Sequence, residues 1–406
     1  MSATGLISVE AAQAQLLDGV APLAAEAVAL AAAAGRILAE PLAALRTQPA
    51  FAASAMDGYA IRWADRAGPW RVVGTAFAGA GFGGSVGAGE AARILTGAPL
   101  PAGADTVIVQ EDVARDGNSL RLTGDGPPRE GAHIRRAGLD FSEGEALLAA
   151  GTRLLAPQIG LTAAAGHAAV RVHRRPRVAL LATGDELVLP GAATGPHQII
   201  SSNGVMLAAL LGDCADIVDA GIARDEADAL RDAVAACADA DVLVTIGGAS
   251  VGDHDLVKPV LEAMGARFDF WKVAMRPGKP VMRGRLGGQH VIGLPGNPVS
   301  AFVTALLFVK PLLQRLAGAA APLPLLHPAR LDGTLPANGS RRDYMRAVAV
   351  RDRAGWRLTA LPTQDSSMLR TLASANALLV REVNAPAVGN DGPVSFLLLD
   401  TSLDVA

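Results

Sequence analysis

The fold of the largest region of this chain is decided by the stretch DVLVTIGGASVGDHD at residues 241–255. An apolar run that leads directly into a glycine-rich polar turn is typical of a strand buried on both faces of a parallel sheet. Two further stretches have the same design, RVALLATGDEL at 177–187 and HVIGLPGNPVS at 290–300. Segments with helical spacing separate the three runs. Residues 176–325 are therefore predicted to form a doubly wound α/β domain.

The sequence on either side of this domain predicts three more regions, so the whole is an α/β and β multidomain chain. Residues 46–145 alternate short β-like runs with glycine-rich turns and predict a β-rich insert. The insert interrupts an α-rich N-terminal region, 1–45 plus 146–175, where helical spacing extends over residues 8–40. The first roughly 20 residues of that region are expected to pack on the α/β domain. Residues 326–406 follow a proline-rich linker and predict a small β-barrel.

Composition excludes several classes of protein. The 406 residues include 36 Lys and Arg against 39 Asp and Glu, a formal net charge of −3, which gives no support for nucleic acid or anionic membrane as a partner. The two cysteines, Cys214 and Cys237, rule out a disulfide framework and a Cys-rich metal site. No signal segment is evident, and no apolar run reaches the about 18 residues of a spanning helix. We expect a cytoplasmic protein.

The turns that follow the three strands form the candidate site, because ligands of open α/β sheets bind beyond the carboxyl ends of the strands. Glycines there let backbone N–H groups approach a phosphate, and a helix that begins with proline offers free N–H groups to an anion. The predicted substrate-binding residues of these turns are Thr183, Gly184, Asp185, Gly247, Gly248, Ser250, Gly252, Asp253, Pro295, Gly296, Asn297 and Pro298. Ordinary tight turns between strand and helix remain the alternative for any single loop.

Carboxylates are concentrated in the same turns. Asp185, Glu186, Asp253 and Asp255 are predicted to share the sheet edge, with Asp225 joining them from a further strand end. Such a group repels itself unless a cation is present, and its oxygen atoms suit Mg²⁺ bound to phosphate oxygens. Each acid could instead cap a helix, and Asp225, at the start of a helix, is the weakest member.

A basic turn follows a little later in the chain. The stretch KVAMRPGKP at 272–280 carries Lys272, Arg276 and Lys279 beside the phosphate-type loops. Three cations at this spacing indicate an oxyanion pocket that includes Lys279 among the substrate-binding residues. The alternative is a solvated charged turn at a strand end.

Seven motifs, in order and spacing, resemble the molybdopterin molybdenumtransferases, the MoeA family that includes the E domain of gephyrin. The motifs are SAMDGYA, TGAPLPAGAD, ATGDEL, SSNGVML, GGASVGDHD, RPGKP and GLPGNPVS, and the resemblance covers nearly the whole chain. It implies insertion of molybdate into adenylylated molybdopterin with release of AMP, using a divalent cation, Mg²⁺. It also implies an elongated homodimer whose active cleft lies between the α/β domain of one subunit and the insert of the other. A separate molybdopterin adenylyltransferase would supply the substrate.

The resemblance assigns roles to single residues. The family's catalytic residues correspond to Asp57, Thr96, Asp140, Glu186, Asp225 and Asp255, with Glu226 as the alternative to Asp225. Its molybdate-binding residues correspond to Lys272, Arg276, Arg346 and Ser366. We further hypothesise that Glu186, Asp253 and Asp255 hold the divalent cation. Arg276 is a departure, because relatives can carry lysine there, and an arginine fork is not equivalent to a point charge.

Two other functions compete with this interpretation. An adenylyltransferase-like enzyme would need little more than the α/β domain and would leave residues 1–170 and 325–406 without a purpose. A non-catalytic scaffold of the gephyrin type would bind a peptide, yet the chain shows no long linker or fused domain that favours this role. A generic phosphate-binding protein is the remaining possibility.

Overall fold

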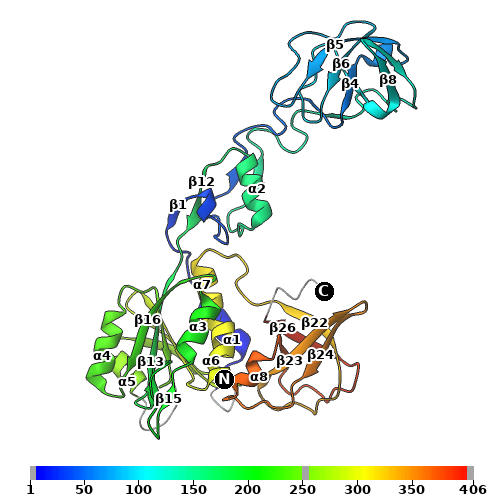
Figure 1. Cartoon of the computed structure of the whole chain (residues 1–406). Helices are drawn as coiled ribbons and strands as arrows, with labels where there is room; N and C mark the ends of the chain where they lie inside the picture. Colours follow the sequence, from blue (N-terminus) through cyan, green and yellow to red (C-terminus); the bar gives the residue numbers. More distant parts are fainter. Residues whose placement is uncertain (1–5, 249–255, 400–406) are drawn as a thin grey trace.

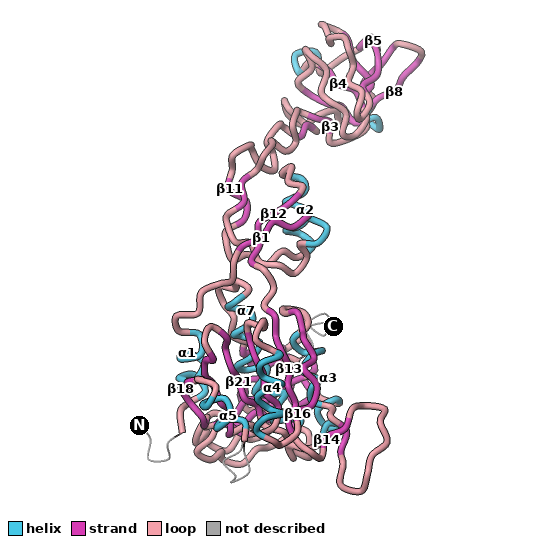
Figure 2. Tube along the Cα trace, turned by 90° about the vertical axis from the view of Figure 1, so that its left-hand side faces the viewer, coloured by secondary structure: helices cyan, strands magenta, loops and turns pink. Residues whose placement is uncertain are grey.

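In a computed structural model of the chain, residues 6–248 and 256–399 are described, and they form an elongated molecule (Figure 1). The α/β domain and the C-terminal domain lie side by side at one end. The N-terminal region stands on the α/β domain, and the insert lies at the opposite end of the molecule (Figures 1 and 2). The insert is therefore far from the α/β sheet of its own chain.

The α/β domain is built on a six-stranded sheet in the order β16-β13-β17-β21-β20-β18. The bounds are β13 Arg177–Thr183, β16 Asp216–Ala223, β17 Val242–Ile246, β18 Arg267–Lys272, β20 Pro280–Leu286 and β21 Gln289–Leu294. The first four strands in this order run parallel, whereas β20 and β18 are antiparallel to their neighbours. The three apolar runs of the sequence are β13, β17 and β21, and these are neighbours in the sheet. Their carboxyl ends consequently meet at one edge, as the sequence predicts.

Helices cover both faces of this sheet. Val178 and Leu180 of β13 face a core built with α1, α3 and α7, whereas Ala179 and Leu181 face α4 and α5. The helices are α1 Val9–Leu17, α3 Asn203–Leu211, α4 Ala227–Ala236, α5 Val257–Ala263, α6 Pro298–Thr304 and α7 Lys310–Leu316. A π-helical segment, η4 Ala305–Val309, joins α6 to α7. The alternation of faces along each strand confirms the doubly wound class.

The continuous helix Pro298–Leu316 is apolar and long enough to cross a membrane by length and composition, and it is the one such helix in residues 6–248 and 256–399. This corrects the expectation that no apolar segment reaches that length. The protein buries 78 % of its most apolar window, which is the environment of a core helix. Helix α1 packs against its second half, and the Gln13 side chain donates to the Leu307 carbonyl at 3.0 Å. Pro311 has no N–H to serve that carbonyl, so Gln13 replaces the missing helical donor.

The N-terminal region differs from the predicted long helix. Helix α1 ends at Leu17, and residues Ala25–Ala29 form strand β1, paired antiparallel with β12, Ala169–His173. The C-cap residue Asp18 is already extended, with a ψ of 131°, and Gly19 follows it with a left-handed φ of +62°. Alanine favours helices by only a fraction of a kcal/mol, roughly 0.5 per residue, so pairing with a distant strand overrides it. The region also contains η1 Leu30–Ala32, β2 Leu42–Ala43, β11 Ala146–Leu148 and α2 Ala156–Ala164.

The insert and the C-terminal domain are both β structures. The insert has a six-stranded sheet in the order β7-β4-β6-β5-β9-β8. Its strands are β4 Gly58–Ile61, β5 Trp70–Ala76, β6 Glu90–Ile94, β7 Thr106–Val109, β8 Val113–Asp116 and β9 Ser119–Leu122. The C-terminal strands are β22 Leu326–Leu331, β23 Arg342–Asp352, β24 Gly355–Ala360, β25 Ala377–Arg381 and β26 Pro393–Leu398. Because β23 pairs with both β24 and β25, these five strands close into the predicted barrel.

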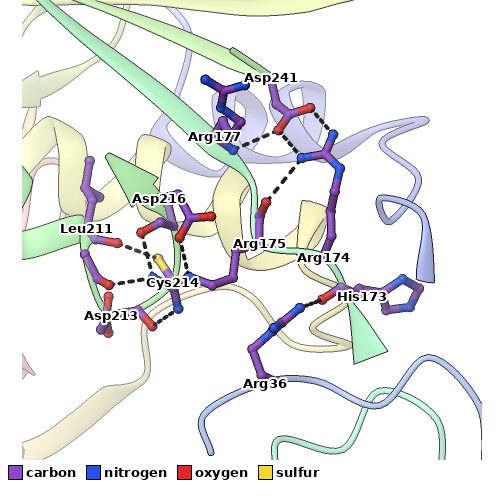
Figure 3. Close-up of polar contacts among 12 residues, drawn as sticks. Arg36, His173, Arg174, Arg175, Arg177, Leu211, Asp213, Cys214, Asp216 and Asp241 are labelled. Atoms are coloured by element: carbon purple, nitrogen blue, oxygen red, sulfur yellow. Dashed lines mark hydrogen bonds and ion pairs between the residues drawn. The ribbon is translucent and has the colours of Figure 1, made fainter. Parts of the chain in front are cut away.

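Arginines brace the junction between the N-terminal region and the α/β domain (Figure 3). Arg174 donates to both carboxylate oxygens of Asp241, at 2.7 and 2.6 Å. Arg175 donates to Asp216 at 2.7 Å and also to the backbone carbonyls of Gly212 and Ala215, which lie between α3 and β16. Arg36 reaches the carbonyl of His173 at 2.7 Å. Charged donors thus hold the connecting segment on the α/β domain through several bonds rather than a single flexible contact.

Candidate functional site

The first turn of the candidate site, after β13, brings three carboxyl groups together. Asp185 accepts a hydrogen bond from the backbone N–H of Asp225, 3.2 Å away, so the ends of β13 and β16 meet. Glu186 folds back over Gly184, where an added Cβ would lie 2.6 Å from the Glu186 carboxylate. Gly184 has a φ of +144°, which a side chain would strain. The turn therefore needs glycine to place Glu186.

Asp225 lies in this carboxylate group and is not the helix cap. Helix α4 takes Glu226 as its N-cap residue, one position later. Burial raises the pKa of the Asp225 carboxyl, and repulsion by Asp185 and Glu186 raises it further. A bound cation at this edge would relieve that repulsion. Within residues 6–248 and 256–399, no group of three His, Cys, Asp or Glu side chains is arranged to hold a metal ion.

The second and third turns touch each other and the first. Gly247 has a φ of +95°, and a Cβ there would lie 2.8 Å from the carbonyl oxygen of Thr183, so these backbones approach as only glycine allows. At Gly248 a Cβ would lie 2.3 Å from the Val257 side chain. A Cβ added to Gly296 would lie 3.7 Å from the Cα atom of Gly247, so the third turn is next to the second. The structure thus brings Thr183, Gly184, Asp185, Glu186, Asp225, Gly247, Gly248, Pro295, Gly296, Asn297 and Pro298 to one sheet edge.

Four predicted residues, Ser250, Gly252, Asp253 and Asp255, fall in 249–255 and lie outside the described residues. One residue that the sequence reasoning missed is Asn203, at the start of α3. Its side-chain amide donates to the Gly296 carbonyl at 2.6 Å and fixes the third turn. The motif SSNGVML was the available signal, because an Asn at the start of an apolar helix can hydrogen-bond to neighbouring backbone.

The basic turn lies between the α/β domain and the barrel. Strand β19, Met275–Arg276, pairs with the start of β23, and Arg276 forms a two-point ion pair with Asp343. This hydrogen bonding raises the pKa of Arg276. Lys272 and Lys279 have no carboxylate partner among the described residues. Gly278, at a φ of +98°, packs so closely on α6 that a Cβ would lie 2.4 Å from the Thr304 methyl group.

Arg346 and Ser366 lie where the barrel meets α6. The Arg346 side chain is 1 % exposed and donates to the carbonyls of Thr363 and Asp365, at 3.3 and 2.9 Å. Burial lowers the pKa of its guanidinium, and Asp365 opposes that shift. Ser366 accepts a hydrogen bond from the Asn297 side chain at 3.0 Å, and its carbonyl accepts from Val299 N–H at 3.0 Å. Arg346 therefore contacts the loop of Ser366, and that loop contacts the third turn.

The predicted residues of the insert form a separate group. Asp57 accepts hydrogen bonds from the backbone N–H and the hydroxyl of Thr96, at 2.7 and 2.8 Å. These bonds lower the pKa of the Asp57 carboxyl, with a smaller contribution from Arg93. Asp140 is exposed in the segment that leads out of the insert, where its N–H bonds to the Gln48 carbonyl. Asp57 and Thr96 thus belong to the domain at the opposite end of the molecule from the sheet edge (Figure 1).

Three family descriptions match successive parts of the chain. Residues 7–166 match the MoeA N-terminal region (domain I and II), 179–315 a probable molybdopterin binding domain, and 328–399 the MoeA C-terminal region (domain IV). The molybdopterin molybdenumtransferase of Haemophilus influenzae is 38 % identical over 318 residues, covering 77 % of this chain and 78 % of the relative. The chain belongs to the molybdopterin molybdenumtransferase family. The family predicted from the seven motifs is confirmed, and with it a place in molybdenum cofactor biosynthesis.

Further relatives extend this match to almost the full length. The molybdopterin molybdenumtransferase of a Nostoc species is 36 % identical over 388 residues, covering 92 % of this chain and 88 % of the relative. The crystal structure of a molybdopterin biosynthesis MoeA protein from Pyrococcus horikoshii matches with a TM-score of 0.82 and 26 % identity, covering 97 % of this chain and all of that one. Because all regions of the chain match, an adenylyltransferase confined to the α/β domain is not favoured.

Proposed function

We propose that this chain is a transferase that inserts molybdate into adenylylated molybdopterin and releases AMP. The observation that carries the proposal is the continuous set of contacts along the sheet edge. It runs from the carboxylates of the first turn, through Gly247 and Gly296, to Ser366 and the barrel. The names of the relatives, molybdopterin molybdenumtransferases, support the same reaction.

The charges on this edge suit two anionic substrates. The phosphates of the adenylylated pterin and the molybdate dianion repel each other, so a site that brings them together needs fixed positive charge. Lys272 and Lys279 supply ammonium groups that no described carboxylate neutralises. We assign the glycine turns, with Asn297 and Pro298, to the pterin phosphate and the anhydride. We assign molybdate binding to Lys272, Arg276, Arg346 and Ser366. We assign catalytic roles at the sheet edge to Glu186 and Asp225.

Mg²⁺ is proposed as the divalent cation. The donor chemistry fits, because Glu186 is exposed among carboxylates whose mutual repulsion raises the pKa of Asp225. Glu186 would hold the cation together with Asp253 and Asp255, which lie outside the described residues. When bound, the cation would supply counter-charge to the leaving phosphate oxygens. The protein's own part is to fix Glu186 over Gly184 and to hold the anhydride beside it.

We propose a homodimer whose cleft is shared between subunits. Asp57 and Thr96 are held together, yet they lie in the domain farthest from the sheet edge of the same chain (Figure 1). A second copy would bring its insert, with this pair and Asp140, to the edge. The proposed setting is cytoplasmic, with a molybdopterin adenylyltransferase as the upstream donor. No nucleic acid and no membrane is proposed as a partner, in line with the net charge of −3.

The direct test is to incubate the purified chain with adenylylated molybdopterin, Mg²⁺ and molybdate, and to measure AMP and pterin-bound molybdenum. AMP release together with molybdenum on the pterin is the expected result. The Glu186→Gln variant, which removes one carboxylate charge at the edge, should release AMP at least about tenfold more slowly. A wild-type protein that binds the adenylylated pterin but releases no AMP would contradict the proposal.

A further inference from the structure

The side-chain amide of Gln364 is paired with the backbone of Arg346. The Arg346 N–H donates to Gln364 Oε1 at 2.9 Å, and Gln364 Nε2 donates to the Arg346 carbonyl at 3.0 Å. Nε2 also donates to the carbonyl of Leu361 at 2.7 Å. The register between β23 and β24 ends with Ala347 opposite Ala360, where the Leu361 N–H still donates to the Arg346 carbonyl at 2.9 Å, and the amide adds its two bonds to Arg346 beside that contact. The carboxamide supplies the acceptor and the donor of all three contacts from one planar group.

The loop 363–367 is thus attached to Arg346 twice: Gln364 bonds to the Arg346 backbone, and the Arg346 side chain bonds to the loop backbone. The guanidinium of Arg346 donates to the carbonyls of Thr363 and Asp365. The carboxylate of Asp365 accepts from the N–H and the hydroxyl of Ser367, at 2.8 and 2.6 Å. Ser366 is the remaining loop residue. In the described hydrogen bonds of this loop, it is the residue that contacts the start of α6: its hydroxyl accepts from Asn297 and its carbonyl from Val299.

We infer that Gln364 is a positioning residue that holds the Ser366 hydroxyl beside Asn297, where molybdate would bind. The inference rests on the proposed function, which gives Ser366 and Arg346 their substrate. The Gln364 amide bonds to the backbone of Arg346 and Leu361, so it acts on Ser366 through the loop. A binding group that is already held in place before its ligand arrives favours affinity, because the cost of ordering that group is then not subtracted from the free energy of binding.

The barrel offers a matched control on the same strand. Asn376 makes the same two-way pairing with Ala349, accepting from its N–H at 2.7 Å and donating to its carbonyl at 2.9 Å. Asn376 precedes β25 and has no described hydrogen bond to the Ser366 loop. Loss of either amide therefore removes two comparable hydrogen bonds to the β23 backbone. Of the two residues, Gln364 lies in the Ser366 loop and Asn376 does not.

The experiment compares Gln364→Met with Asn376→Leu in the full-length protein. Each change keeps a side chain of similar size and removes the amide. AMP release is measured against molybdate concentration at saturating adenylylated molybdopterin, and hydrogen–deuterium exchange is followed in the peptide that covers 361–369. We expect Gln364→Met to raise the KM for molybdate at least about fivefold with kcat within about twofold, and to speed exchange in that peptide. Asn376→Leu should leave both unchanged.

A milder variant covers the case in which Gln364→Met does not fold. Gln364→Asn keeps the amide group on a side chain one methylene shorter, so its bonds to the Arg346 backbone are weakened and KM and exchange should shift in the same direction. Equal KM and equal exchange in the Gln364 and Asn376 variants would overturn the inference. Absence of AMP release by the wild-type protein would instead count against the proposed function, while faster exchange of the loop in Gln364→Met would still support its anchoring.

Discussion

The guanidinium of Arg276 and the carboxylate of Asp343 form a two-point ion pair that joins the basic turn of the α/β domain to strand β23 of the barrel. Nε lies 2.7 Å from Oδ1, and Nη2 bonds to Oδ2 beside it. Asp343 is 6 % exposed, so this buried carboxylate depends on Arg276 for its counter-charge. The Asp343 carboxylate offsets the charge of Arg276. Lys272 and Lys279 are then the cations of this turn that have no carboxylate partner among the described residues.

Replacing Arg276 should therefore weaken the attachment of the barrel as well as any binding of anions. Arg276→Ala leaves Asp343 buried without its charged donor, and we expect a loss of about 1–3 kcal/mol in the free energy of unfolding. Arg276→Lys restores one contact and should lose less, because an ammonium group cannot form the fork. Urea denaturation of the three proteins measures both changes. Equal stability of Arg276→Ala and wild type would show that the pair contributes nothing.

The bond between Gln13 and Leu307 predicts a second stability effect far from the site. Gln13→Leu would leave the buried Leu307 carbonyl without the donor that replaces the N–H absent at Pro311. An unsatisfied buried carbonyl costs about 1–3 kcal/mol, so the midpoint of urea denaturation should fall accordingly. Gln15→Leu, at an exposed position on the same helix, is the matched control and should change the midpoint little. An equal effect of the two substitutions would rule out a special role for Gln13.

The α/β core was predictable because its strands are buried on both faces. A short, continuous apolar run that ends in a glycine-rich turn has few alternatives to a buried strand. The three runs form β13, β17 and β21. The glycines after them were predictable as site residues for the same reason, since positive φ and close backbone contact leave few alternatives at Gly184 and Gly247. Strand Ala25–Ala29 was not predictable, because its conformation depends on a partner 144 positions away, Ala169–His173.

The surroundings of the site residues were harder to predict than their positions. Nothing in the local sequence shows that Arg346 is buried and bonded to loop carbonyls, or that Asp343 would pair with Arg276. Both depend on how the barrel closes against the basic turn. The separation of Asp57 from the sheet edge likewise follows from the arrangement of whole domains, which periodicity does not encode (Figure 1).

The Asp57–Thr96 contact predicts a measurable titration. Two hydrogen bonds from Thr96 lower the pKa of the Asp57 carboxyl, the backbone N–H contributing more than the hydroxyl. Thr96→Ala keeps the backbone bond and should therefore raise that pKa only part of the way to its ordinary value. A lowered pKa stabilises the folded protein above the ordinary value, and this contribution is lost as pH falls through the lowered one. NMR titration of the Asp57 carboxyl measures its pKa in the wild type and in Thr96→Ala. Ser119→Ala, in β9 of the same domain, is the control and should leave that pKa unchanged. An unchanged pKa in Thr96→Ala would contradict the contribution of the hydroxyl.

Repulsion at the first turn predicts a substitution that stabilises the protein. The pKa of Asp225 is raised, by burial and by Asp185 and Glu186, so the ionised form is unfavourable in the folded state above that raised value. Asp225→Asn removes the charge and should raise Tm at pH 7 by roughly 1 °C, with a smaller gain at low pH, where the wild-type carboxyl is protonated. Asp232→Asn, on the exposed face of α4, should not do so. A lower Tm for Asp225→Asn would show that its charge is compensated.

The shared cleft predicts that two inactive variants restore activity together. Asp57→Ala removes a residue of the insert and Glu186→Ala a residue of the sheet edge, two domains at opposite ends of one chain (Figure 1). If each site combines the edge of one subunit with the insert of the other, a mixed dimer keeps one intact site of two. Random exchange in an equal mixture makes about half the dimers mixed, so about a quarter of wild-type AMP release should return. Each variant mixed with itself is the control, and a mixture as inactive as those controls, with exchange of subunits verified by mass spectrometry, would place each site within a single chain.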